Sequence, residues 1–226
     1  MTYLKTIFIY DIILYWIIIM VYYAHFQKRL TEMKIILASK SPRRREILEN
    51  LGLEFDIVVA DADESSDIRE PDDLVMTLAA RKGRAVREKI GDEKNDTLII
   101  ACDTLVYADG EFLGKPRDRA DAERMIRTLS GSFHYVVSGI YLCYNGREVS
   151  AAASTKVFFD ELTDSDVEAY LNTSEPYDKA GAYAIQGKAS AYISGIEGDY
   201  FNVVGLPVNL LCKTLKNEFG IDICKN

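Results

Sequence analysis

The sequence predicts a mixed α/β fold, with a single domain in which helices flank an elongated mixed sheet. In the first half of the chain, buried-strand runs of branched residues alternate with amphipathic helical stretches. In the second half, two long apolar runs flank an Asn-Gly pair, which is the pattern of a β-hairpin. The 226 residues are 48% hydrophobic and 27% charged, as in one globular domain with an appendage. A mean hydropathy of −0.06 excludes a polytopic membrane protein.

The first half of the chain carries clear start and stop signals. Residues 34–38 (KIILA) form a buried-strand run, after which Ser41 can cap a helix that has Pro42 at its first position and ends at Asn50. The other elements expected here are a strand over 55–60, a helix over 71–90 closed by Gly91, a strand over 97–107 that turns at Asp109-Gly110, and a helix capped by Asp118 that ends at Ser130-Gly131.

The second half begins with the hairpin, whose strands cover 133–144 and 147–159. Thr163 and Asp166 then have capping-box spacing for a helix that ends near Thr173. The remaining elements are a glycine-rich strand and loop over 181–205 and a closing helix over 207–219, with Leu210, Leu211, Thr214 and Leu215 on one face.

The N-terminal 32 residues differ from the rest of the chain. Residues 7–26 are apolar except for Asp11 and His25, and the uninterrupted part, 12–24, is shorter than the roughly 20 residues that span a bilayer. No small-residue cleavage site follows, which argues against a secretory signal peptide. We therefore divide the chain into a hydrophobic extension over 1–32 and a domain over 33–226.

Three interpretations of this extension stay open. The natural start could be Met33, because MKIILAS leads directly into a strand. Alternatively, the extension could be a membrane anchor, with Lys28, Arg29 and Lys34 holding the domain on the cytoplasmic side, or it could be an additional packed helix.

Charge and cysteine usage limit the partners and the compartment. A net charge of −8 argues against nucleic acid as a partner, because such binding needs a basic face. The two histidines exclude a histidine-rich metal site. The four cysteines lack CxxC spacing and resemble reduced core thiols of a cytoplasmic protein; they are Cys102, Cys143, Cys212 and Cys224.

Two basic residues occupy positions where helical periodicity calls for apolar side chains. Lys82 falls in the middle of an apolar stripe, so its ammonium must snorkel, pair with an acidic neighbour or meet an anionic ligand. Arg44 lies on the same side of its helix as Ile47 and Leu48, while Arg45 points to solvent. Cations in a first helical turn oppose the macrodipole, so Ser39-x-Ser41-Pro-Arg-Arg predicts a phosphate site, with a solvated basic patch as the alternative.

Two carboxylates, Asp103 and Glu64, could supply the acidic groups of the same site. Asp103 is flanked by apolar residues inside TLIIACDTLVY, where a carboxylate is costly unless it is paired, coordinates a metal or caps a loop. Glu64, in the acidic loop DADESSD, could be a second oxygen ligand for Mg²⁺, or part of a solvated acidic run. Lys115 in GKPRD adds a further cation. This set predicts metal-dependent phosphoryl or nucleotidyl chemistry without a P-loop or a GxGxxG motif.

Several motifs then identify a resemblance that extends from Met33 to the C-terminus. LASKSPRRREIL, ACDTLV, GKPRD, LSG followed by His134, DKAGAYAIQG and VVGLP are similar to motifs of the Maf family of nucleoside triphosphate pyrophosphatases, also described as septum-formation inhibitors. The resemblance implies an inosine triphosphatase-like fold with a cleft between two lobes. It also implies hydrolysis of a nucleoside triphosphate to the monophosphate and pyrophosphate with a divalent metal.

The resemblance implies roles for particular residues. Asp103 would be the proton acceptor, and Arg43, Thr104 and Gln186 match the subgroup that acts on dTTP and UTP. The amide of Gln186 suits the O4 and N3–H edge of uracil or thymine. The phosphate contacts expected are Ser39, Ser41, Arg44, Lys82 and Lys115, and the metal ligands are Glu64 and Asp103. Lys40 and Cys102 depart from the family pattern without touching this chemistry.

The expected cofactor is Mg²⁺ or Mn²⁺, and the expected partner is a small nucleotide. We expect no nucleic acid, a membrane only if residues 1–26 are a real anchor, a cytoplasmic location and a homodimer. The alternative to a house-cleaning hydrolase linked to cell-division arrest is a nucleotide-binding regulator of septum formation that acts through a protein partner.

Overall fold

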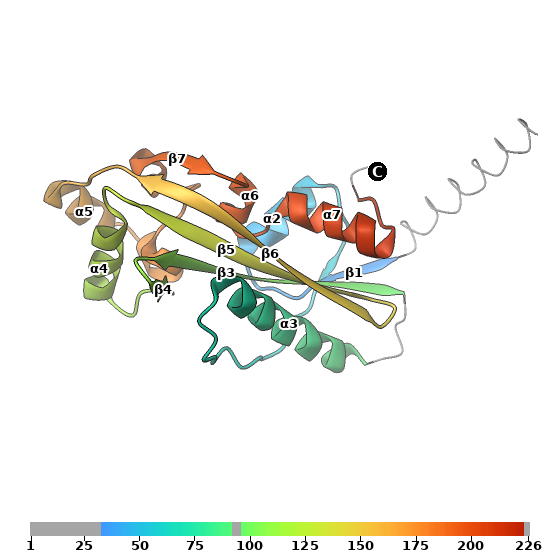
Figure 1. Ribbon diagram of the computed structural model, residues 1–226. Coiled ribbons are helices and arrows are strands. Elements are labelled where there is room, and N and C mark those ends of the chain that lie inside the picture. The colour runs from blue at the N-terminus through green and yellow to red at the C-terminus, as the bar shows by residue number, and fades with distance from the viewer. Residues whose placement is uncertain (1–32, 92–95, 224–226) are drawn as a thin grey trace, which may run out of the picture. The chain divides into compact units, whose positions relative to one another are not determined.

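The protein is built on a mixed seven-stranded sheet (Figure 1). The computed structural model describes residues 33–91 and 96–223. The strand order is β2-β1-β3-β5-β6-β7, and β4 pairs with β3 beside this path. The β1–β2 pair is parallel and β3, β5, β6 and β7 are antiparallel, which confirms the predicted mixed α/β class. The strands are β1 (Lys34–Leu37), β2 (Asp56–Ile57), β3 (Thr97–Ala108), β4 (Glu111–Leu113), β5 (Phe133–Tyr144), β6 (Arg147–Phe159) and β7 (Ile193–Glu197).

The helices begin where capping side chains predicted them. Ser41, Asp118 and Thr163 each accept a hydrogen bond from a backbone N–H of the helix that follows, and Thr163 with Asp166 forms a full capping box. In Figure 1, α3 covers one face of the sheet, and α2, α6 and α7 lie on the other. The α-helices are α2 (Pro42–Asn50), α3 (Pro71–Ile90), α4 (Arg119–Leu129), α5 (Asp164–Leu171), α6 (Tyr200–Val204) and α7 (Val208–Phe219).

Two expectations differ from the structure. The strand expected over 55–60 is only two residues long, because its partner β1 ends at Leu37 and leaves later residues without a ladder. The stretch expected as strand and loop over 181–205 contains β7, short 3₁₀ turns and α6. Asp199 caps α6 and Gly205 ends it, so the glycine-rich stretch contains a short helix that the sequence pattern did not indicate.

Two glycines let α3 approach the sheet closely. A Cβ on Gly139 of β5 would lie 2.4 Å from the backbone carbon of Val75, and a Cβ on Gly83 of α3 would lie 2.1 Å from the ring of Tyr141. Both distances are far below van der Waals contact. The missing side chains therefore fix the separation of α3 from β5 and from its neighbour β3.

Within the part of the chain that the structure describes, two clusters of the apolar core border a cavity. One cluster joins β1 and α3 through residues such as Ile36 and Val86, and the other joins α4 and α5 to the far ends of the long strands. The cavity is lined by residues of both clusters, among them Ala38, Val86, Val106 and Val136. The cleft expected between two lobes corresponds to this cavity.

The extension over 1–32 lies outside the described residues, and the three interpretations of it stay predictions. Across residues 33–91 and 96–223, no helix combines the length and apolarity that a bilayer crossing requires. From Ile35 onward, the described residues belong to one compact unit.

Candidate active site

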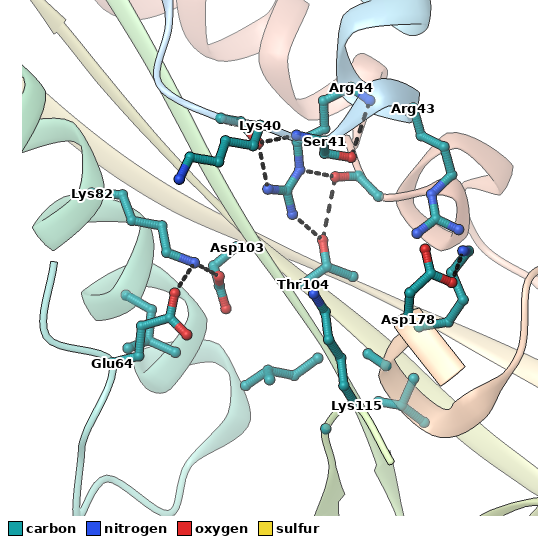
Figure 2. Close-up of a pocket in the computed structure, with 18 of the residues that line it drawn as sticks. Lys40, Ser41, Arg43, Arg44, Glu64, Lys82, Asp103, Thr104, Lys115 and Asp178 are labelled. Atoms are coloured by element: carbon teal, nitrogen blue, oxygen red, sulfur yellow. Dashed lines mark hydrogen bonds and ion pairs between the residues drawn. The ribbon is translucent and has the colours of Figure 1, made fainter. Parts of the chain in front are cut away.

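All ten residues predicted for the site line one cavity of about 980 Å³. Figure 2 shows most of them gathered around β3, with Lys82, Glu64 and Asp103 on one side and the start of α2 on the other. The ten come from segments far apart in the chain. They are Ser39, Ser41, Arg43, Arg44, Glu64, Lys82, Asp103, Thr104, Lys115 and Gln186.

The cavity lies along an open stretch of the β3 edge. Near one end of this stretch, the N–H of Ala38 donates to the carbonyl of Ile100 over 2.8 Å, just after β1 ends. At the other end, β4 pairs with β3 only from Val106 onward. Asp103 and Thr104 lie between these points, and since side chains alternate along a strand, they point to opposite faces. Both reach the cavity because it spans the strand edge.

On the α3 face, a buried acid and an exposed acid share one ammonium group. Asp103 is only 8% exposed, and the Lys82 Nζ lies 2.5 Å from its Oδ1. The same Nζ lies 2.8 Å from Oε1 of Glu64, whose side chain is 66% exposed. Burial alone would lower the pKa of Lys82, but the two carboxylates raise it above its ordinary value. Lys82 is therefore charged, and its anion is the acid pair itself.

Glu64 and Asp103 have the right chemistry for a hard divalent cation. Mg²⁺ is usually held by one or two carboxylates together with substrate phosphates and water. Within the described residues, no cluster of three or more His, Cys, Asp or Glu side chains could hold a metal alone. The two carboxylates would thus fit a cation that arrives with a phosphate ligand.

On the opposite face, Arg44 ties α2 to the sheet. Its Nε donates to the Gly205 carbonyl over 2.8 Å, Nη1 donates to Ser39 Oγ over 3.1 Å and Nη2 donates to Thr104 Oγ1 over 3.0 Å. A guanidinium has five N–H donors, so two are left for an anion in the cavity. The inward direction expected for Arg44 is confirmed, and Arg45 pairs instead with Glu49 at the surface.

The Thr104 hydroxyl is engaged within the protein. Besides accepting from Arg44, it lies 2.8 Å from Ser138 Oγ and 3.3 Å from the Gly205 carbonyl. That carbonyl also accepts from the thiol of Cys102 at 3.3 Å. Gly205 has a φ of 123°, which side-chain-bearing residues rarely adopt, so glycine is required to aim this carbonyl at three donors.

The residues expected to choose the base lie at the same cavity. Burial lowers the pKa of Arg43, and the nearby carboxylates Asp178 and Glu175 oppose this effect. Figure 2 shows the Arg43 guanidinium turned toward Asp178. Gln186 and Lys115 line the cavity and are exposed to solvent.

Sequence reasoning missed several residues of the cavity. Lys40, which departs from the family pattern, lines the cavity beside Ser39. Asp178 and Tyr183 of the DKAGAYAIQG motif also line it, although the resemblance assigns no role to these two residues. Only the three-dimensional arrangement shows that these side chains meet the cavity.

Fold and site together define the class of protein: an α/β protein with a nucleotide-sized cavity that carries cations and a pair of acids. The chain belongs to the Maf-like protein family, which matches residues 34–218. The resemblance drawn from the motifs is thereby confirmed.

Curated relatives cover most of the chain. A dTTP/UTP pyrophosphatase of Caldanaerobacter subterraneus subsp. tengcongensis is 50% identical over 191 residues, which are 84% of this chain and 91% of the relative. The dTTP/UTP pyrophosphatase of Acetivibrio thermocellus is 46% identical over 199 residues, covering 85% and 98%. Among solved structures, the Staphylococcus aureus Ham1 protein is similar with a TM-score of 0.47 and 16% identity, covering 82% of this chain and 99% of that chain.

Proposed function

We propose that this protein hydrolyses dTTP and UTP to the monophosphate and pyrophosphate. Relatives named dTTP/UTP pyrophosphatase, 46–50% identical over most of the chain, support this assignment. The observation that carries it is the buried Asp103, paired with Lys82 and Glu64 at a cavity that Arg44 and Lys115 also line.

Glu64 and Asp103 would hold Mg²⁺ or Mn²⁺ together with the phosphates of the substrate. When bound, such an ion neutralises phosphate charge and polarises the phosphorus–oxygen bonds. Asp103 orients a water molecule and accepts its proton, and the water oxygen attacks the α-phosphorus. The bond from the α-phosphorus to the bridging oxygen breaks, and pyrophosphate leaves with that oxygen.

Cations of the cavity stabilise the charge that develops in this reaction. Lys82 moves from its carboxylate partners to the phosphoryl oxygens, and Lys115 and the two remaining donors of Arg44 contact the departing pyrophosphate. Ser39 and Ser41 line the same end of the cavity and contribute hydroxyl groups. This role is electrostatic, since none of these groups forms a covalent intermediate.

Base selection is assigned to other residues that line the cavity. The Gln186 amide donates to O4 and accepts from N3–H of uracil or thymine, and Arg43 lines the same cavity. Thr104 contributes by fixing Arg44, because its hydroxyl is already engaged within the protein. A wrong base leaves these polar groups unpaired.

The test is pyrophosphate release across a panel of nucleoside triphosphates, with and without Mg²⁺. We expect dTTP and UTP to be the preferred substrates and chelation of the metal to stop the reaction. Asp103→Asn should lower kcat by about 10² to 10⁴ because the amide cannot accept the proton. Turnover within a few-fold of wild type would refute the role of Asp103, and silence with every pyrimidine triphosphate would favour the regulator of septum formation.

The same proposal places the enzyme in the cytoplasm, acting on free nucleotides, as a homodimer. Buried free thiols at Cys102 and Cys143 support a reducing compartment. Sedimentation of the purified protein tests the dimer, and cell fractionation tests the compartment.

A further inference from the structure

The segment that carries Gln186 is held at both of its ends by polar contacts with other parts of the chain. Residues 184–186 line the cavity and include no helix or strand. One turn bond lies within the loop, from the N–H of Gly187 to the carbonyl of Ala184 over 3.0 Å, and the contacts at its two ends come from other segments. The contacts that fix it involve residues with no role in the chemistry described above.

At the far end of this loop, the Glu175 carboxylate binds the backbone. Its Oε2 accepts from the N–H of Lys188 over 2.7 Å, and its Oε1 accepts from the N–H of Ala189 over 3.1 Å. A Cβ on Gly187 would lie 2.1 Å from Oε2, so the carboxylate rests directly on the residue that follows Gln186. Only glycine permits this approach.

At the near end, two tyrosines hold the backbone. The Tyr170 hydroxyl lies 3.0 Å from Glu175 Oε1 and 3.2 Å from the Ala182 carbonyl, so it links both ends of the loop. Ala182 is fully buried with a φ of 59°, a conformation that costs a residue with a side chain about 1–2 kcal/mol. The next residue, Tyr183, has its hydroxyl 2.7 Å from Nε2 of the buried His134.

Glu175 also faces the other residue expected to choose the base. Its negative charge, with that of Asp178, favours the charged form of Arg43 at the start of α2. Asp178 is bonded to Lys179 and makes no contact with the loop backbone among the bonds of the described residues. The two acids therefore exert the same kind of effect on Arg43, while Glu175 alone holds the loop.

We propose that Glu175 is a positioning residue for base selection: it fixes the loop that presents Gln186 and aligns it with Arg43. This inference rests on the proposed function, in which Gln186 reads the pyrimidine. A fixed backbone sets the distance and direction from which the Gln186 amide reaches the edge of the base, and discrimination between uracil and cytosine depends on that placement.

The test compares Glu175→Gln with Asp178→Asn. Both variants remove one negative charge near Arg43, but only Glu175→Gln places an amide N–H₂ against a backbone N–H of the loop. For Glu175→Gln we expect KM for UTP to rise about tenfold, the preference for UTP over CTP in kcat/KM to fall about tenfold, and kcat for UTP to stay within threefold. Asp178→Asn removes a charge near Arg43 without touching the loop backbone, so it measures the effect of that charge alone, and the loss of UTP to CTP preference should be at least threefold larger in Glu175→Gln.

A second measurement does not depend on activity. Amide hydrogen exchange at Lys188 and Ala189 should be at least tenfold faster in Glu175→Gln than in Asp178→Asn. If Glu175→Gln does not fold, Tyr170→Phe, which removes one hydroxyl from the same set of contacts, should show the same loss of preference to a smaller degree.

The outcomes separate the two proposals. Wild-type exchange rates and wild-type preference in Glu175→Gln would overturn the positioning role, as would an equal loss of kcat with every nucleotide. A wild-type enzyme that hydrolyses no pyrimidine triphosphate would overturn the proposed function, while the exchange rates would still show whether Glu175 holds the loop.

Discussion

Lys82 connects the two acids of the site through a single ammonium group. That ammonium contacts both Asp103 and Glu64, and Asp103 is buried. A buried charge without a partner is costly. Lys82 is thus the group that compensates the buried acid of the site before any substrate arrives.

Replacing Lys82 with methionine should lower kcat for UTP by about 10² to 10³, the usual effect of losing one group that stabilises transition-state charge. Lys89→Met is the matched control, since Lys89 lies on the same helix and its ammonium donates to the backbone carbonyl of Val59 and to no side chain among the described residues. Steady-state kinetics checks both variants. Equal activity in Lys82→Met and Lys89→Met would contradict the role given to Lys82.

His134 makes the stability of the fold sensitive to acid. Burial lowers its pKa to about 4, and its Nδ1 has no hydrogen-bond partner among the described residues. Below pH 6.5 the unfolded chain binds a proton that the folded protein accepts only near pH 4. The free energy of unfolding should therefore fall by about 3 kcal/mol as the pH is lowered through this window.

Denaturant titrations of the wild type and of His134→Gln between pH 7.5 and 4 measure this effect. The wild type should lose about 3 kcal/mol more than the variant, because glutamine does not titrate. Above pH 6.5 the difference between the two proteins should not change with pH. Parallel curves across the whole range would mean that the pKa of His134 is the same in the folded and the unfolded protein.

At the scale of elements, the position of α3 determines where Lys82 meets β3. Gly139 and Gly83 remove the side chains that would separate the helix from the sheet. Gly139→Ala must push the backbone at Val75 outward, which should cost about 1–3 kcal/mol of stability, as overpacking does. Because α3 carries Lys82, kcat should fall as well.

Thermal unfolding and UTP hydrolysis of Gly139→Ala test this expectation together. Gly195→Ala in β7 is the control, since a Cβ there meets only Phe158, at 4.0 Å. The control should keep wild-type stability and activity within error. A Gly139→Ala protein as stable and active as wild type would show that α3 adapts without moving Lys82.

The local elements could be predicted because their signals are local. Ser41-Pro42, Gly91 and the Thr163–Asp166 pair end or begin helices through contacts a few residues away. The length of β2 depends on where β1 ends, and α6 has five residues, too few for a periodic pattern. The length of β2 can therefore be predicted only when its partner strand is known, and α6 only when the residues that pack around it are known.

The site could be predicted to the extent that charges stood in apolar patterns. Lys82, Arg44 and Asp103 were found because a buried charge is costly and calls for a partner. Glu175 and His134 gave no such signal, since their partners come from segments that only folding brings together. Roles such as metal ligand or base reader depend on the family resemblance, not on spacing.

At the scale of the whole molecule, the family match over 34–218 lies within the predicted domain over 33–226. A chain that starts at Met33 should therefore fold and hydrolyse UTP with kcat and KM within twofold of the full chain. Purification of both chains, followed by kinetics and thermal unfolding, checks this. An insoluble or inactive shorter chain would instead favour the extension as a packed helix of the fold.

The open edge of β3 divides the cavity into two parts, one on each face of the sheet. Asp103 lies on one face with Lys82, and Thr104 lies on the other with Arg44. A nucleotide that contacts both faces must cross the edge of β3, with its reacting phosphate beside Asp103 and its base beyond Thr104. The phosphate chemistry therefore draws on both faces of one strand, and a substitution on either face should change turnover.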